Sequence, residues 1–239
     1  MELIDKFKKL VNDIFSLTNE KQALFCLDFI SDVTTDYLIS YFDCKVHESL
    51  SSVINKVVSS PPAVVYEMIE YKGFVLEVSF WYPLQSEDSD GYDYSEIHDH
   101  SCFIVSKMLK GDGYLEKQYE LSQLELNKVT YKRNYKFSEG MKRIIKPNDI
   151  HSIIYSSDKT SLSIRILLPM QKSIIRVYDY ETGYETRQVV SPYERKCFEL
   201  ATILSMLSKE KFKQDIATIR ANLSNKSFLN NLNNYENNF

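Results

Sequence analysis

The stretch "YSEIHDHSCF", residues 94–103, carries two of the chain's four histidines. One residue separates His98 from His100, and residues i and i+2 of a strand point to the same side. If this stretch is extended, both imidazoles lie on one face, at a spacing that suits a single bound ion. A third histidine, His151, opens a later segment of strand character just after the turn sequence Pro147-Asn148-Asp149. The pattern predicts a metal site made by these three histidines.

Segments of strand character surround this pattern. Between residues 63 and 190, short runs rich in β-branched and aromatic residues alternate with turn sequences such as Gly111-Asp112-Gly113 and Thr182-Gly183. About ten such runs without intervening helices are typical of a β-sandwich or barrel. We therefore expect residues 63–190 to form a mostly β domain.

Helices are expected on both sides of this domain. Residues 1–62 form an N-terminal helical region in our interpretation, because "LIDKFKKLVNDIF" has a helical apolar stripe and "SLSSVINKVV", residues 49–58, continues the region as a further helix. The sequence "SPYE", residues 191–194, predicts the start of C-terminal helices over residues 191–222. The asparagine-rich tail, residues 223–239, is predicted to be disordered.

Composition excludes several classes of function. The net charge is −4 with acids and bases intermixed, which argues against a nucleic-acid surface. No run of eighteen apolar residues is present, so we expect no membrane span, and no signal peptide is apparent. The four cysteines are far apart in the sequence and form no CxxC pair. We expect a cytoplasmic protein with free thiols.

The order of strand, HxH, glycine turn, further strands, proline turn and histidine resembles the cupin superfamily. Its first motif would place His98 and His100 as ligands, Ile104 where the family has a glutamate, and Gly111 at the closing glycine. The second motif is matched loosely by residues 140–151. This resemblance implies a double-stranded β-helix, which is a jelly-roll barrel, with N-terminal helices and a C-terminal helical extension.

Three histidines without the glutamate resemble the cysteine dioxygenase, or thiol dioxygenase, branch of that superfamily. "IHDHSCF" and "KMLKG" look like the corresponding segments of this branch, and so do the later "SLSIRILLP" and "VYDYETG". The resemblance implies Fe(II) and an O2-dependent oxidation of a small-molecule substrate, such as a thiol. Imidazole ligands alone do not choose the metal, so Zn, Ni or Mn remain alternatives.

The sequence departs from that branch where it would bind the substrate. The branch holds its substrate carboxylate with an arginine before the tryptophan, whereas this chain has no arginine before Arg133. On the strand after the third ligand, Ser163 and Arg165 stand where the branch has histidine and tyrosine. Arg165 therefore either faces the pocket or, if the apolar residues of 162–168 fill the barrel, is solvated.

Further pocket candidates come from neighbouring segments. Trp81 and Tyr155 are either pocket aromatics or core residues, and Cys102 either approaches the metal or is a buried thiol. The acidic loop 83–96 is either a solvated insertion or a lid that brings Tyr92 or Tyr94 to the pocket mouth. Asp99 should point away from the two histidines that flank it, toward surface or turn hydrogen bonds.

These observations favour a mononuclear non-haem iron enzyme of thiol-dioxygenase type that does not bind free cysteine through the usual arginine. Its partners would be a small-molecule substrate and O2, with a homodimer through the helices as a further expectation. One alternative is a cupin isomerase, hydrolase or lyase that uses a divalent metal as a Lewis acid. The other is a non-catalytic cupin module that binds a ligand or a protein.

Overall fold

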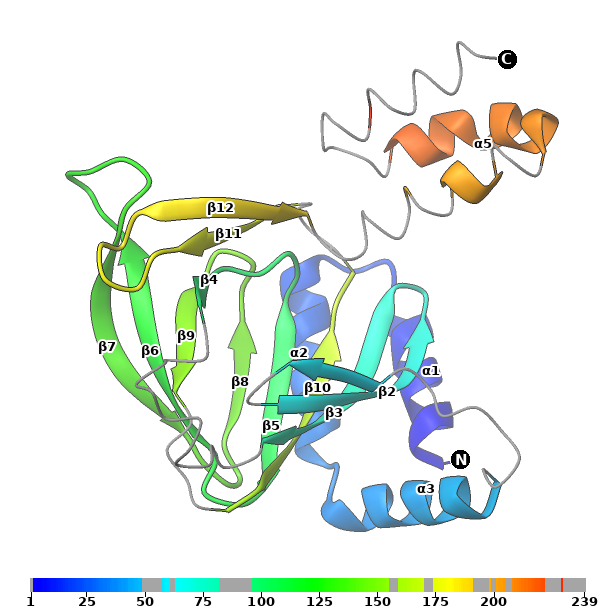
Figure 1. Ribbon diagram of the computed structural model, residues 1–239. Helices are drawn as coiled ribbons and strands as arrows, with labels where there is room; N and C mark the ends of the chain where they lie inside the picture. The colour runs from blue at the N-terminus through cyan, green and yellow to red at the C-terminus, as the bar shows by residue number, and fades with distance from the viewer. Residues whose placement is uncertain are drawn as a thin grey trace.

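The computed structural model (Figure 1) describes residues 2–48, 57–60, 63–81, 96–154, 159–169, 174–190, 198, 201–204, 208–221 and 229. Tyr94, Tyr155, the predicted lid up to residue 95 and the capping sequence 191–194 lie outside these ranges. The named helices are α1 (Glu2–Ile14), α2 (Asn19–Ser31), α3 (Thr35–Glu48) and α5 (Lys209–Ala221). No described helix is long and apolar enough to cross a membrane.

The strands form two antiparallel sheets of six strands each. The order in the first sheet is β1 (Val57–Ser60), β2 (Ala63–Tyr71), β3 (Phe74–Trp81), β10 (Ser161–Leu167), β5 (Ile104–Lys110) and β8 (Lys142–Ile145). The order in the second sheet is β12 (Glu185–Val190), β11 (Ile174–Tyr178), β4 (Ile97–His98), β9 (Ile150–Ile154), β6 (Tyr114–Leu121) and β7 (Val129–Phe137).

The pairing of the central strands is nested. The hairpin β6–β7 is the innermost pair, followed outward by β5–β8, β4–β9 and β3–β10. Successive pairs alternate between the two sheets, so one long antiparallel ribbon is wound into a barrel. This is the jelly-roll topology of the cupin fold. The predicted mostly β fold is therefore confirmed, and β1, β2, β11 and β12 extend the two sheets.

Close backbone contact at one turn helps to define this winding. Gly113 has φ +75° in the turn between β5 and β6, and a Cβ there would lie 1.7 Å from the carbonyl oxygen of Phe137. No other residue fits this position, because a side chain would overlap the backbone of β7. The glycine turn predicted at residues 111–113 is confirmed.

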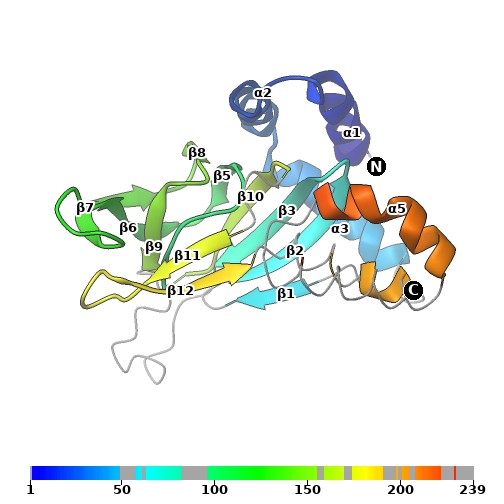
Figure 2. The same cartoon turned by 90° about the horizontal axis from the view of Figure 1, so that it is seen from above.

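Helices α1 and α2 cover the outer face of the first sheet, as Figures 1 and 2 show from two directions. Their apolar stripes form the main hydrophobic core together with that face. Phe7 and Ile30 from the helices, and Ile164 and Ile166 from β10, are fully buried in it. The largest apolar cluster of the described chain therefore lies outside the barrel, between the helices and the sheet.

The orientation of Arg165 follows from this arrangement. Because Ile164 and Ile166 face the helices, the alternating residues Ser163 and Arg165 face the barrel interior. The neighbouring strand β3 repeats the pattern, with Leu76 and Val78 toward the helices and Glu77, Ser79 and Trp81 toward the interior. The apolar face of residues 162–168 does not fill the barrel, so the interior has room for polar side chains.

One local prediction is wrong. Residues 57 and 58, predicted as the end of a helix, belong to strand β1, where Val57 and Val58 pair with Tyr66 and Val65. These β-branched residues extend the sheet instead, so strand pairing starts before residue 63. Of residues 223–239 the structure describes Leu229 alone, so the predicted disorder of that tail stays a prediction.

Replacement of Ile166 by alanine tests the helix-covered core. We expect the free energy of unfolding to fall by about 2–5 kcal/mol, because the side chain is fully buried between β10 and the helices. Leu124→Ala is the control, since Leu124 is 96% exposed and should change stability by less than about 0.5 kcal/mol. Urea unfolding of both variants measures this, and equal small effects would contradict the packing described.

Candidate metal centre

The jelly roll brings the three predicted histidines together. His98 at the end of β4 is the direct antiparallel partner of His151 in β9, and His100 follows two residues after His98. One potential ligand atom from each of the three side chains lies within 4.8 Å of the other two. The Nε2 atoms of His100 and His151 are 2.7 Å apart. Residues distant in the sequence thus converge on one point inside the barrel.

Contacts of the Nδ1 atoms orient two of the three imidazole rings, those of His98 and His151. Nδ1 of His98 lies 2.7 Å from the carbonyl oxygen of Glu96, and Nδ1 of His151 lies 3.0 Å from Oε2 of Glu116. A carbonyl oxygen can only accept a hydrogen bond, so Nδ1 of His98 carries the proton and its Nε2 lone pair is free for a ligand bond. The Glu116 carboxylate beside Nδ1 of His151 favours the same tautomer there. Neighbouring groups normally orient metal-binding histidines in this way.

Glu116 on β6 is in turn held by Arg143 on β8. Nη1 of Arg143 forms an ion pair with Oε2 of Glu116, and Nη2 donates to the hydroxyl of Tyr114 at 2.6 Å. Burial raises the pKa of Glu116, but the hydrogen bond from His151 and the charge of Arg143 outweigh it and lower that pKa to about 2. Glu116 is therefore a carboxylate at neutral pH and presents its Oε2 to Nδ1 of His151.

A second buried carboxylate fixes the backbone between the two neighbouring histidines. Asp99 is 0% exposed and accepts two hydrogen bonds from Arg176 on β11, at 2.8 Å from the backbone nitrogen and 3.0 Å from Nε. The backbone nitrogen of His100 donates to the carbonyl oxygen of Pro147 at 3.1 Å. The expectation of a surface role for Asp99 is wrong, because β11 covers it and supplies a charged partner.

Burial keeps His98 and His100 neutral. Burial, with a smaller contribution from His151, lowers the pKa of His98 to about 4. Burial and the neighbouring histidines lower the pKa of His100 well below its usual range, and the charges of Arg143 and Arg165 act in the same direction. Three imidazoles with converging nitrogens are a suitable donor set for a divalent transition metal. The residues present therefore fit the metal that the fold implies.

The pocket candidates Arg165, Ser163 and Trp81 lie together on the interior face of the first sheet. Arg165 forms an ion pair with Glu77, and its guanidinium carbon is 6.0 Å from the centre of the Trp81 ring. Nε1 of Trp81 donates to Oγ of Ser163 at 2.9 Å. Arg165 faces the interior, but a carboxylate on the adjacent strand already takes up its charge.

Cys102 belongs to a small apolar cluster with Ile104, Ile145 and Leu167. Burial, together with the charge of Glu77, raises the pKa of its thiol to about 12. Among the described residues, the group able to hold a metal contains the three histidines and not this cysteine. Of the two roles considered for Cys102, the structure supports the buried neutral thiol.

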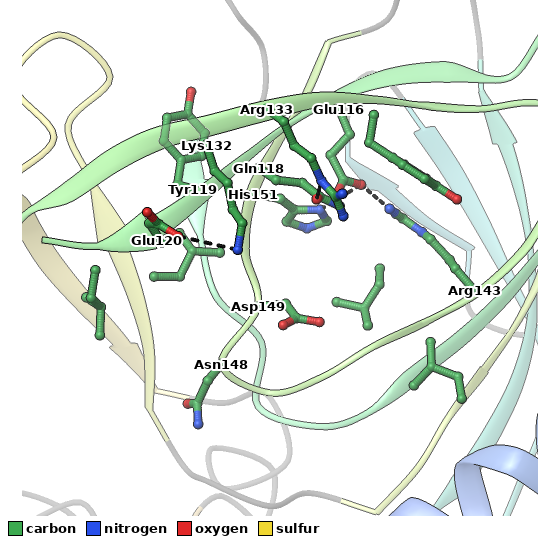
Figure 3. Close-up of a pocket in the computed structure, with 15 residues that line it drawn as sticks. Glu116, Gln118, Tyr119, Glu120, Lys132, Arg133, Arg143, Asn148, Asp149 and His151 are labelled. Atoms are coloured by element: carbon green, nitrogen blue, oxygen red, sulfur yellow. Dashed lines mark hydrogen bonds and ion pairs between the residues drawn. The ribbon is translucent and has the colours of Figure 1, made fainter.

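A cavity of ≈ 490 Å³ opens beside His151 (Figure 3). Its deep wall includes Glu116 and Arg143, and its outer wall includes Arg133 on β7 and Asp149 in the turn before β9. The other residues that line it are Gln118, Tyr119, Glu120, Leu121, Lys132, Tyr135, Ile144, Ile145, Asn148 and Ile150. A small molecule in this cavity would contact the residues that orient His151.

Sequence reasoning missed Glu116, Arg143 and Arg133. Tyr114, Glu116 and Gln118 alternate along β6, so the segment has the period of a strand with a polar inner face. That period was visible in the sequence, but a polar face is usually assigned to solvent. The inward direction becomes evident only when His151 is placed opposite Gln118 in the adjacent strand.

The chain is similar to several solved structures, each at low sequence identity. No family model and no curated protein matches the chain. Among solved structures, it is similar to the hydroxypropylphosphonic acid epoxidase of S. wedmorenis, with 10% identity over 50% of this chain and 61% of that chain, at a TM-score of 0.34. A chain from the DMSP lyases RdDddP and RnDddQII has 11% identity over 44% of this chain and 47% of that chain, at 0.29.

The plu4264 protein from Photorhabdus luminescens has 11% identity over 47% of this chain and 80% of that chain, at a TM-score of 0.33. The chain thus spans 61% of the epoxidase and 47% of the lyase. The fold assignment rests on the nested strand pairing. Strand order and the converging imidazoles define a jelly roll of the cupin type with a three-histidine candidate metal centre.

Replacement of Glu116 by glutamine tests how His151 is held. We expect metal affinity to fall by about 10- to 100-fold, because the neutral amide orients the imidazole less firmly and leaves the Arg143 charge uncompensated. Competition with a chromophoric chelator measures the affinity. Glu120→Gln is the control on the same strand, since Glu120 is exposed and pairs with Lys132 at 3.3 Å. Equal affinities in the two variants would contradict the role of Glu116.

The low pKa of His98 predicts a pH dependence of stability for the metal-free protein. Between pH 6.5 and about 4, the unfolded chain binds a proton at His98 that the folded chain does not bind. The free energy of unfolding should therefore decrease as the pH falls through this window, by up to about 1.4 kcal/mol per pH unit. Urea unfolding in chelator measures the slope. His98→Gln should reduce it, and an unchanged slope in that variant would contradict the buried neutral histidine.

Proposed function

We propose that this chain is a mononuclear metal-dependent oxidoreductase of the thiol-dioxygenase type. It would bind Fe(II) through His98, His100 and His151 and oxidise a small thiol with O2. The observation that carries this proposal is the donor set, which contains three imidazoles and, among the described residues, no carboxylate. Such a set leaves the positive charge of a divalent ion uncompensated and leaves ligand positions open.

The bound metal would supply Lewis acidity, which favours a thiolate over a thiol, together with the redox chemistry of O2 activation. The overall reaction is RSH + O2 → RSO2H. Both oxygen atoms form bonds to sulfur, so sulfur loses four electrons and O2 gains four. No other oxidant or reductant is required.

The protein would supply orientation and a hydrogen-bond donor. Glu116 and Glu96 hold the imidazoles of His151 and His98, and Asp99 fixes the backbone between His98 and His100. The hydroxyl of Tyr114 accepts a hydrogen bond from Arg143 and does not line the cavity, so its own proton would reach only a substrate that extends past Arg143. Burial raises the pKa of Tyr114, which keeps that proton in place.

The charge pattern also argues against free cysteine bound in the manner of the family. This chain has no arginine before Arg133, so the strand that carries the usual clamp offers none. Arg165 and Arg143, which face the interior from other strands, are each paired with a glutamate. A substrate with a different arrangement of charge fits this site better.

Metal analysis with oxygen-uptake measurements tests the proposal. Protein purified without chelator should contain about one iron per chain, since the three histidines form a single site. A panel of small thiols should include one that consumes O2 and yields a sulfinate. His100→Ala should lose the iron and at least about 100-fold in rate, because two ligands hold a metal weakly.

The remaining histidine provides the control. His47 belongs to α3 and is not one of the three histidines proposed as ligands, so His47→Ala should keep both iron and activity. Full occupancy by zinc without thiol-dependent oxygen uptake would replace this proposal with Lewis-acid chemistry at the same ligands. Failure to bind any metal would leave a non-catalytic binding module.

A further inference from the structure

The arginines around the barrel interior differ in their partners. Arg143, Arg165 and Arg176 each form an ion pair with a buried carboxylate, on Glu116, Glu77 and Asp99 respectively. Arg133, which is exposed, lines the cavity together with Arg143, but the group that it contacts is neutral: its Nε donates to Oε1 of Gln118 at 2.8 Å. No carboxylate within the described ranges pairs with Arg133, so its charge differs from the other three in being available to a ligand.

The strand register directs Arg133 toward the cavity. Arg133 is the partner of Gln118 across β6 and β7, on the face that also carries Tyr135 and Phe137. Figure 3 shows its side chain extending from β7 toward His151 and Glu116. A guanidinium has five N–H donors, and the contact with Gln118 uses the one on Nε. The two terminal NH2 groups remain for a bidentate contact.

The acidic residues that line the same cavity are already engaged. Glu116 pairs with Arg143, and Glu120 pairs with Lys132 at 3.3 Å. The carboxylate of Asp149 accepts a hydrogen bond from the backbone nitrogen of Lys146, at 2.8 Å, within its own turn. The carboxylates that line the cavity therefore interact with groups other than Arg133. The terminal groups of Arg133 face a space of ≈ 490 Å³.

We propose that Arg133, oriented by Gln118, binds the anionic group of the small-molecule substrate. The anion would be a carboxylate or a phosphate-type group, because a guanidinium presents parallel N–H donors that match two oxygens of either. The cavity is large enough for a small ligand that reaches from Arg133 to His151. That the bound anion belongs to a substrate rests on the proposed function, but the anion site itself does not require a metal.

Anion titration of the full chain, as purified and after chelator treatment, tests the site. The probes are acetate and inorganic phosphate at constant ionic strength; calorimetry measures the affinity in the unmodified chain and in every variant, and the NMR signal of the Arg133 Nε–Hε group reports the contact in the unmodified chain. We expect saturable binding of at least one probe, with an affinity about tenfold weaker in Arg133→Gln, because a charge-assisted bidentate contact is lost. The probe that binds distinguishes a carboxylate site from a phosphate site.

Two further variants sharpen the result. Lys136→Gln removes the same charge from the same strand at an exposed position opposite Leu115, and it should bind the probe as the unmodified chain does. Gln118→Glu would give Arg133 the carboxylate partner that the other three arginines have, and it should weaken binding about as much as Arg133→Gln does. It also provides the test if Arg133→Gln does not fold, with binding followed by calorimetry in both variants.

The inference is overturned if neither anion binds or if Arg133→Gln binds as tightly as the unmodified chain. It is also overturned if Lys136→Gln weakens binding equally, since that would indicate general attraction to a basic strand. These outcomes are separate from the metal question. Anion binding in chelator-treated protein can succeed while iron is absent, and iron can be present while Arg133 binds no anion.

Discussion

The pairing of β4 with β9 is the constraint on which the site depends. It places His98 directly opposite His151, and a shift of one residue would turn an imidazole to the outer face of the sheet. β4 is only two residues long, so its own ladder cannot hold this register. The nested pairs on either side, β5–β8 and β3–β10, and the contacts of Asp99 with Arg176 supply what the short strand lacks. The site is therefore a consequence of the whole winding.

The helices determine what the barrel interior can contain. An isolated jelly roll would bury its apolar faces between its own sheets, but here α1 and α2 cover the outer face of the first sheet. Ile164 and Ile166 pack beneath those helices, and this leaves Ser163 and Arg165 on the inner face. An interior that is polar near the histidines is thus compatible with stability, because the principal core lies on the other side of the sheet.

The sequence allowed the mostly β fold and the three histidines to be predicted, because alternation and turn residues are local signals. The sequence did not decide whether Arg165 faces the pocket or solvent, because that depends on which face of its strand the helices cover. Glu116 and Arg143 were missed for a related reason. A charged residue in a strand is normally solvated, and only the tertiary pairing of β6 with β9 places the Glu116 carboxylate beside His151. Helix was wrongly predicted for Val57 and Val58, because their pairing with β2 is not local.

Buried ion pairs near the histidines have a cost that points to their role. An ion pair such as Arg143–Glu116, nearly inaccessible to solvent, contributes less to stability than apolar residues of the same volume often would. The carboxylate nevertheless does what an apolar residue cannot, since it fixes the tautomer of His151 and directs its Nε2 inward. Because each carboxylate that lines the cavity already interacts with another donor, none of them pairs with Arg133 within the described residues. An arginine held only by an amide, as Arg133 is, then becomes the group on which an incoming anion would be expected to bind.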